Sequence, residues 1–399
     1  MKFIPYGRQL IDDSDIAAAL RVLRSDFLTC GPEIESFEHD FASMVGARYA
    51  VAVCNATAAL HLAMLVTGVS REQRVVTSPN TFLASANCAA YAGAIPDFCD
   101  IDPVSYNLDP AKLEEGWRAD TKAVVAVDYA GQPCNMPIIA QIARARGAVV
   151  IEDACHGTGG GFQYEGKNWM LGGHPWADIT TFSFHPVKSM TTGEGGMLVT
   201  DNEEYARRAR LLRAHGVERS DSRFLSSDIC PLTSEHGPWF HEMQELGYNY
   251  RITDLQCALG RSQLKKLPVF IRRRQEIVTR YNQAFDGLPY ISTPNLRPPA
   301  SDCKALISWH LYTLRIDFSS LDQMRTDVMM TLRQQGVGSQ VLYIPVYLQP
   351  WYRRTYGYGP GKCPVAESFY SQALSLPLYA GLTDEEIERV IQAVRALVQ

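Results

Sequence analysis

The chain has 399 residues, and its 38 basic and 43 acidic residues give a net charge of −5 at pH 7. That balance, without a long basic run, argues against a nucleic-acid partner and against an anionic membrane surface. The first residues lack the apolar core of a signal peptide, and no apolar run approaches the roughly 20 residues that cross a membrane. The ten cysteines are scattered singly, which favours free thiols in a reducing compartment. We therefore expect a cytoplasmic protein.

The first 200 residues alternate between apolar runs and helical stretches. Ser14 or Asp13 is suited to cap a first helix, and Pro32 to begin a second. Continuous β-branched runs separated by helices are typical of buried strands in a mostly parallel sheet flanked by helices. Strands are expected over residues 49–54, 122–128, 147–153, 177–184 and 196–200, and helices over 56–66 and 136–145. The predicted fold class of this part is α/β.

The pattern changes after residue 216. Residues 216–246 are polar with scattered aromatic side chains, and loops of this length are usually lids, partner contacts or disordered segments. The aromatic residues around His236 and His241 favour a flap over a substrate. Two helices are expected next, over 252–267 and 271–285, and the basic sequence IRRRQ in the second is interpreted as a solvated helix face.

A proline-rich linker over 289–303 leads into a smaller α+β unit. Strands are expected there over 310–317 and 339–345, and helices over 321–335, 364–373 and 383–397. The predicted organisation is therefore a large domain over residues 1–286, which includes the N-terminal segment, and a small C-terminal domain over 287–399.

Lys188 is the first candidate for chemistry. It follows the expected strand over 177–184 and precedes the glycine-rich sequence TTGEGG, which permits close backbone approach. Ligands of open α/β sheets bind near strand ends, and a lysine there can form a Schiff base if its surroundings lower its pKa. Most lysines are surface charges, so position alone leaves both interpretations open.

Asp153 ends the expected strand over 147–153. A carboxylate there can be a metal ligand, a general base or a cap, but no second ligand stands at metal-binding spacing, so no metal is expected. Together with Lys188 it gains another role. Pyridoxal phosphate needs a lysine for its aldehyde and an acid that keeps its pyridine nitrogen protonated.

Three further features are consistent with such a cofactor site. Ala56 and Thr57 stand at a strand-to-helix turn, which suits either plain N-capping or phosphate binding by backbone N–H groups. Ser183 offers another hydroxyl shortly before Lys188. Phe82 is either a core side chain or a stacking surface for a flat ring. A lysine, an acid, a phosphate cup and an aromatic ring in one domain together favour pyridoxal phosphate.

Several longer motifs follow one another along the chain: NATAALHL (55–62), SPNTFLASAN (78–87), DYAGQP (128–133), EDACHG (152–157), FSFHPVKSMTTGEGG (182–196) and GYNYRITDLQCALG (247–260). In this order they resemble the pyridoxal-phosphate-dependent nucleotide-sugar aminotransferases, the DegT/StrS group of the aspartate-aminotransferase superfamily. The similarity extends from about Pro5 to the C-terminus. It implies an aspartate-aminotransferase-like large domain, a smaller C-terminal domain, and a homodimer that shares its active site between protomers.

The resemblance implies a role for each residue of the cofactor site. Lys188 would carry pyridoxal 5'-phosphate as a Schiff base and move the proton during transfer, and Asp153 would pair with the pyridine nitrogen. The other contacts would come from Ala56, Thr57 and Ser183 at the phosphate, Phe82 on the ring, His156 near the phenolic oxygen or ring edge, and Asn249 at the phosphate of the partner protomer's cofactor.

Substrate contacts are harder to place. Family position suggests Tyr6, Thr29, Gly31, His310 and Tyr343. Edge packing is an equal alternative for the two tyrosines, and core packing is an alternative for His310. Arg251 or Arg213 is suited to the carboxylate of an amino donor or to a pyrophosphate, by bidentate pairing. His185 could contact the ring edge or the substrate, or only pack.

Two departures from the family pattern are visible. Many members carry glutamine at the position of His156 and glycine or serine at that of Ala56, and neither change disturbs the chemistry. Through this histidine together with the FSFHPVK and DYAG motifs, the chain resembles a branch that aminates C4 of a UDP-linked 4-keto-6-deoxy-N-acetylhexosamine toward pseudaminic acid, with L-glutamate as donor. Alternatives are another UDP-, dTDP- or GDP-linked keto sugar, C3 amination, or a scaffold on a degenerate fold. Related sugar dehydratases carry histidine at the lysine position, so Lys188 favours transamination.

Overall fold

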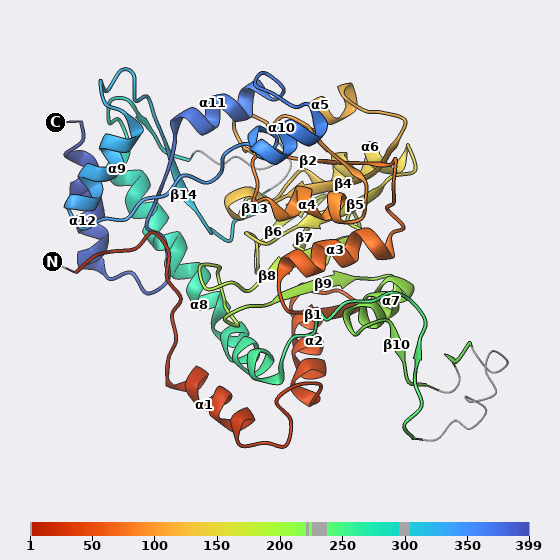
Figure 1. The fold of residues 1–399 in the computed structure, drawn as a ribbon. Coiled ribbons are helices and arrows are strands. Elements are labelled where there is room, and N and C mark those ends of the chain that lie inside the picture. Colours follow the sequence, from red (N-terminus) through yellow and green to blue (C-terminus); the bar gives the residue numbers. More distant parts are fainter. Residues whose placement is uncertain (1, 221–222, 226–237, 295–303, 399) are drawn as a thin grey trace.

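A computed structural model describes residues 2–220, 223–225, 238–294 and 304–398 (Figure 1). Its centre is a seven-stranded sheet with the strand order β1-β9-β8-β5-β4-β2-β3. The strands from β8 to β3 pair in parallel, whereas β9 runs antiparallel to both β1 and β8. The strands are β1 (Tyr49–Val53), β2 (Arg74–Thr77), β3 (Ile95–Phe98), β4 (Thr121–Val127), β5 (Val149–Asp153), β8 (Ile179–Ser183) and β9 (Gly196–Thr200). The predicted mixed, mostly parallel α/β sheet is confirmed.

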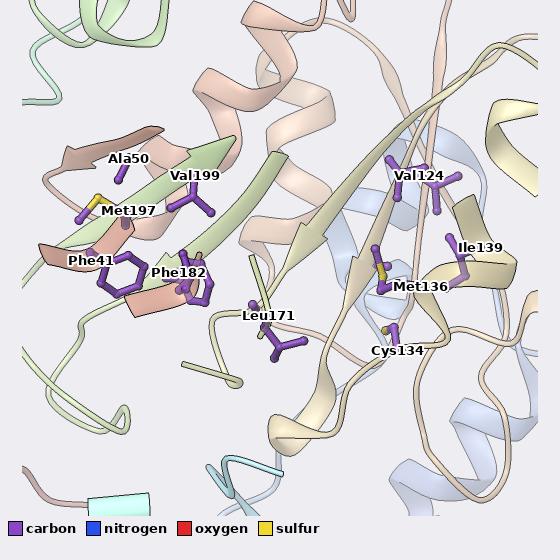
Figure 2. Close-up of a cluster of buried hydrophobic side chains, with 14 of the residues drawn as sticks. Phe41, Ala50, Val124, Cys134, Met136, Ile139, Leu171, Phe182, Met197 and Val199 are labelled. Carbon is purple, nitrogen blue, oxygen red and sulfur yellow. The ribbon is translucent and has the colours of Figure 1, made fainter. Parts of the chain in front are cut away.

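Both faces of this sheet are buried. Ala50 and Val124 belong to one apolar cluster, while their neighbours Val51 and Val125 point to the opposite face and belong to another. The first cluster includes side chains of α2 (Pro32–Val45) and α6 (Met136–Arg144), and the second those of α3 (Ala56–Val66), α4 (Ala84–Tyr91) and α7 (Glu203–Arg213). Figure 2 shows part of the first cluster, where Phe41 and Phe182 lie together. Burial on both faces explains the continuous apolar runs.

A smaller antiparallel sheet lies near both chain ends (Figure 1). In it, β14 (Tyr312–Ile316) pairs with β12 (Ile291–Ser292) and with β15 (Ala373–Leu376). Its side chains are buried together with α9 (Arg325–Gln334), α12 (Asp384–Arg395) and the end of α8 (Asp254–Phe285). Ile4 joins this cluster and bridges to Val337, so the first residues pack with the C-terminal part. The domain boundary at residue 286 stays a prediction.

The 32-residue helix α8 connects the two sheets. A capping box of Thr253 and Gln256 begins it, and its first half packs on α2 and on α1 (Asp13–Leu23). The helix continues through Pro268, where two separate helices were expected. Buried Leu267 and Phe270 anchor it on both sides of the proline, which offsets the missing N–H.

Three other expectations are wrong. The cap of α1 is Asp12, whose side chain accepts from the N–H groups of Ser14 and Asp15. Residues 339–345 are no strand, since only Gln340 bridges to Ser375 before the chain reaches the turn η4 (Val346–Leu348). IRRRQ is not a uniformly solvated face, because Arg274 is 2% exposed.

The remaining elements are short. One small sheet consists of β6 (Gly161–Tyr164), β7 (Lys167–Met170) and β13 (Lys304–Leu306), and another of β10 (Val217–Glu218) and β11 (Glu242–Met243). The remaining helices are α5 (Pro110–Glu115), η1 (Tyr129–Gly131), α10 (Pro350–Tyr356) and α11 (Pro364–Gln372). The expected flap falls partly, and His236 entirely, outside the described residues, as do residues 295–303 of the expected linker. Within the described ranges, no helix is long and apolar enough to cross a membrane.

Candidate active site

The candidate site lies where two neighbouring parallel strands end. Strand β5 ends at Asp153 and β8 ends at Ser183, and Asp153 is in register with Thr181. Parallel pairing brings the carboxyl ends of both strands to one edge of the sheet, where open α/β sheets bind ligands. The loop after β8 then carries Lys188, so the acid and the amine share this edge.

Lys188 is partly buried, and its amine meets a histidine. Its Nζ atom lies 3.5 Å from Nε2 of His310. Burial lowers the pKa of the Lys188 amine, because the charged form loses its hydration, and the nearby cation of Arg274 lowers it further. The thiol of Cys155 and the carboxylate of Asp153 act in the opposite direction. The net effect is a lowered pKa, so the nucleophilic neutral amine is more accessible than in an exposed lysine.

A pair of buried histidines and a tyrosine lie beside this amine. The rings of His156 and His310 are 4.4 Å apart, and Nε2 of His156 lies 3.2 Å from the hydroxyl of Tyr343. The N–H of Ala130 donates to Nδ1 of His156 at 3.2 Å, so the hydrogen of the neutral ring belongs on Nε2, which donates to the tyrosine. Burial, together with the charge of Lys188, holds the pKa of both histidines well below the usual value.

The DYAG motif holds the two histidines in this arrangement. Its Ala130 donates to His156 through the N–H and accepts at the C=O from the N–H of His310, 2.9 Å away. Gly131 has a φ of +93°, and a β-carbon on it would stand 2.0 Å from the carbonyl oxygen of Ser308. Only glycine allows this approach, so the motif reflects close packing against the chain segment that carries His310.

Asp153 is a well-supported buried carboxylate. It is 4% exposed, and one oxygen accepts from the hydroxyl of Ser85 at 2.6 Å while the other accepts from the N–H of Cys155 at 3.2 Å. Thr81 lies 2.7 Å from the Ser85 hydroxyl and extends the network. These bonds fix the orientation of the carboxylate. Ser85 was not among the predicted site residues, although it lies in the motif SPNTFLASAN.

A cup of backbone atoms forms next to Ser183. Ser183 pairs with Gly196 of β9, and Gly196 pairs with Val53 of β1, so three strand ends meet just before α3. The side chain of Asn55 accepts from the N–H of Ala58. The earlier N–H groups of Ala56 and Thr57 have no acceptor within the helix, and they carry the positive end of its dipole. The residues expected to bind a phosphate are therefore brought together.

The remaining candidates are distributed around this centre. Phe82 is 56% exposed, with its ring 6.1 Å from that of Tyr343. Asn249 is exposed and bridges to Ala214, and its neighbour Tyr250 accepts from the N–H of Cys54 at 2.9 Å. The GYNYR motif therefore runs beside the start of α3.

Only some of the expected substrate residues lie close to Lys188. His310 and Tyr343 lie in the site, and Tyr6 is close enough to Tyr343 to contribute, after burial and Tyr129, to the raised pKa of its phenol. Thr29 and Gly31 contact the start of α8 instead, through a bridge to Thr253 and a 2.8 Å bond to Asp254.

The arginines differ in their freedom to bind. Arg213 is occupied, since its guanidinium lies 2.6 Å from both Glu38 and the carbonyl of Ala52. Arg251 and His185 keep their expected roles as predictions. Within the part of the chain that the structure describes, no group of three or more potential ligands could hold a metal ion.

A buried network next to Asp153 was not foreseen. Glu152 accepts from the Thr180 hydroxyl at 2.9 Å and from the N–H of Gly172 at 3.1 Å, and Nε2 of His174 lies 2.8 Å away. This network anchors the end of β5 on the face of the strand opposite to Asp153. His174 stands apart from every motif, so the sequence carried no signal for this pairing.

Comparison with known proteins identifies the fold and the enzyme class. The model of the DegT/DnrJ/EryC1/StrS aminotransferase family matches residues 9–395. The chain belongs to this family. SpsC of Bacillus subtilis, a spore coat polysaccharide biosynthesis protein, is 39% identical to this aminotransferase over 398 residues, which cover 100% of this chain and 97% of SpsC.

Two solved structures resemble this aminotransferase over its whole length. PseC of Helicobacter pylori, an aminotransferase of pseudoaminic acid biosynthesis, has a TM-score of 0.87 and 29% identity, covering 100% of this chain and 99% of PseC. Spr1654 of Streptococcus pneumoniae, whose structure was solved in a pyridoxal phosphate form, has a TM-score of 0.87 and 27% identity, covering 99% of this chain and 98% of Spr1654. The protein is thus a pyridoxal-phosphate-dependent sugar aminotransferase, as predicted.

The residues at the strand ends fit this cofactor. A buried carboxylate with fixed orientation suits a pyridinium nitrogen, and a helix start with free N–H groups suits a phosphate. A β-carbon on Gly196 would lie 2.5 Å from the carbonyl carbon of Asn55, so the cup is closed by backbone alone. The amine of Lys188 completes the set of groups that pyridoxal phosphate requires.

Proposed function

We propose that this aminotransferase moves the amino group of L-glutamate to C4 of a UDP-linked 4-keto-6-deoxy-N-acetylhexosamine, namely UDP-2-acetamido-2,6-dideoxy-β-L-arabino-hex-4-ulose. The main support is the likeness to PseC along the whole chain. The series of contacts from Lys188 to His310, from His310 to His156 and from His156 to Tyr343 adds to it, because these contacts line one side of the lysine amine with polar side chains.

The chain's own groups divide the work. When bound, pyridoxal phosphate supplies an electron sink for the carbon that gains or loses the amine. Lys188 would hold the cofactor and then carry a proton on Nζ, for which its lowered pKa is suited. Asp153 would face the pyridine nitrogen, and Ala56, Thr57 and Ser183 would bind the phosphate.

The tyrosine and histidines would serve the oxygen atoms at the site. Burial keeps the pKa of Tyr343 well above its usual value, so the hydroxyl retains its proton. Since His156 donates to this hydroxyl through Nε2, the tyrosine's own hydrogen is free to point to an oxygen of cofactor or substrate. Phe82 would cover the cofactor ring.

The proposal is tested with a panel of nucleotide keto sugars and L-glutamate, with the new amino centre assigned by NMR. We expect amination of the UDP-linked N-acetyl sugar at C4, and formation of 2-oxoglutarate. Reaction only with dTDP- or GDP-linked sugars, or at C3, would reject the specific substrate and leave the enzyme class intact.

Lys188→Ala provides the mechanistic arm of the same test. It removes the amine that holds the cofactor, so the absorbance of the lysine-bound cofactor and nearly all turnover should disappear; acid–base transfer alone accounts for about 10²–10⁴-fold. The matched control is Lys265→Ala, an exposed lysine on α8, which should keep both. Normal turnover of the Lys188→Ala protein would refute the assigned role.

We further propose a homodimer in which Asn249 of one protomer reaches the cofactor phosphate of the other. The exposure of Asn249 and its position next to the start of α3 support this arrangement. The residues Tyr6, Thr29, Gly31, His310 and Arg251 stay candidates for contacts with the sugar nucleotide or the donor.

A further inference from the structure

The three arginines of IRRRQ have three different environments. Arg272 is exposed, and Arg273 lies 2.8 Å from Asp384 at the surface. Arg274 is 2% exposed, in the middle of α8. Burial of a guanidinium is costly unless its donors are satisfied, so its partners indicate why the sequence retains it.

Arg274 binds carbonyl groups and no carboxylate among the described residues. Its Nη1 donates to the carbonyl of Leu378 at 2.8 Å, and to those of Trp309 and His310 at 3.3 and 3.4 Å. Its Nη2 donates to the carbonyl of Lys188 at 3.4 Å. The bond to Leu378 has an ordinary length and the other three are long. The two hydrogens of Nη1 are shared among three carbonyls, and Nε has no hydrogen-bond partner among the described residues.

These carbonyls belong to three segments that are far apart in the sequence. Lys188 lies in the loop after β8, Trp309 and His310 precede β14, and Leu378 follows β15. Neighbouring contacts reinforce the same junction, since the indole N–H of Trp309 donates to Gln275 at 2.8 Å. Through Arg274, helix α8 therefore supports both Lys188 and His310, whose side chains meet at Nζ and Nε2.

We propose that Arg274 is a positioning residue of the active site, which fixes the backbone of Lys188 relative to that of His310 and places a permanent positive charge behind the lysine. This inference rests on the proposed role of Lys188. Lysine could keep the charge at residue 274, but a single ammonium group cannot present a planar fork to three segments.

The charged and titratable groups around Lys188 define the electrostatic part of this role. Asp153 and Cys155 favour the protonated amine, whereas Arg274 disfavours it. His156 and His310 remain neutral, because burial and the charge of Lys188 lower their pKa. Arg274 is thus the cation that opposes protonation of the Lys188 nitrogen.

The experiment compares Arg274→Met, Arg274→Lys and the control Arg272→Met as holoenzymes. We measure kcat and KM with L-glutamate and a nucleotide keto sugar, and the pH midpoint of the absorbance change of the bound cofactor. Arg274→Met removes the charge, so the midpoint should move to higher pH, and kcat should fall about tenfold or more because the lysine is less well positioned. Arg274→Lys should keep the midpoint near that of the wild type while kcat still falls. Arg272→Met should change neither.

The outcomes separate this inference from the proposed function. If both Arg274 variants fold and match Arg272→Met in kcat and in midpoint, the positioning role is refuted while the role of Lys188 stands. If Lys188→Ala keeps the cofactor absorbance, the proposed function itself fails. Should Arg274→Met not fold, Arg274→Lys decides: a wild-type kcat overturns the inference, and a lowered kcat at an unchanged midpoint supports it.

Discussion

At the scale of single residues, the surroundings of His156 and His310 favour their neutral forms. His156 and His310 are buried next to an amine, and each additional positive charge would repel the others. The Ala130 backbone selects the tautomer of His156, since its N–H needs an acceptor at Nδ1. Protonation of this ring would therefore place two donors against each other. The arrangement makes the fold sensitive to acid.

This sensitivity predicts a pH-dependent stability. The pKa of His156 is lower in the folded than in the unfolded chain, so the unfolded chain binds more protons below about pH 6.5. The contribution of neutral His156 to stability is complete above that pH, and it is lost as the pH falls toward the pKa of His156 in the folded protein. Below about pH 6.5, the free energy of unfolding of His156→Gln should therefore fall with decreasing pH less steeply than that of the wild type, by about 1.4 kcal/mol per pH unit. The measurement is urea unfolding of the cofactor-depleted protein between pH 7.5 and 5.

The control for this prediction is His39→Gln, because His39 is an exposed histidine on α2. It should leave the pH dependence of the free energy of unfolding unchanged. An identical pH slope for the wild type and for His156→Gln would contradict a buried, neutral His156.

At the scale of elements, the phosphate cup depends on how closely β9 approaches the start of α3. A β-carbon at residue 196 would lie 2.5 Å from the carbonyl carbon of Asn55 and 2.6 Å from the amide nitrogen of Ala56. Both atoms are backbone, so neither can rotate away. Any side chain at this position has to push the helix start away from the sheet.

Gly196→Ala should therefore damage the cofactor site and the fold together. Overpacking of this kind costs about 1–3 kcal/mol of stability, which urea unfolding measures. We also expect a lower affinity for pyridoxal phosphate, which fluorescence titration measures. The matched control is Gly359→Ala, where the added carbon meets no atom within 4 Å. Equal affinities of the two variants would show that the cup does not rely on this contact.

The elements that the sequence predicted best are those buried on both faces of the sheet. The apolar runs at β1, β4, β5 and β9 carry their own signal, because their apolar side chains pack on both faces of the sheet. Residues 339–345 contain a similar short apolar run (341–344), yet they form no strand and bring Tyr343 to the site. Their composition resembles a strand, and only tertiary contacts distinguish the two cases. Arg274 was misjudged for the same reason, since its carbonyl partners lie in distant segments.

At the scale of the whole molecule, the site is assembled from segments that lie far apart in the sequence. The large sheet contributes Asp153, Ser183 and Lys188 at its edge, and these were visible in the sequence as motifs at strand ends. His310 comes from the strand-and-helix unit beyond residue 304, held to Ala130 by a backbone bond. No spacing along the chain encodes such a contact, so the family resemblance suggested it where periodicity could not.

In the proposed dimer, each site would contain residues of both protomers, and this can be tested with hybrid dimers. If each site uses Lys188 of one protomer and Asn249 of the other, a hybrid of a Lys188→Ala chain and an Asn249→Asp chain has one site with both defects and one site with neither. Random association of the two chains makes about half of the dimers hybrids, and the purified hybrid, with one intact site of two, should show about half of the wild-type activity per dimer. If each site takes both residues from its own chain, every site in the mixture carries one defect and no activity returns. Co-expression of differently tagged chains, purification of the hybrid and an assay of transamination distinguish the two arrangements.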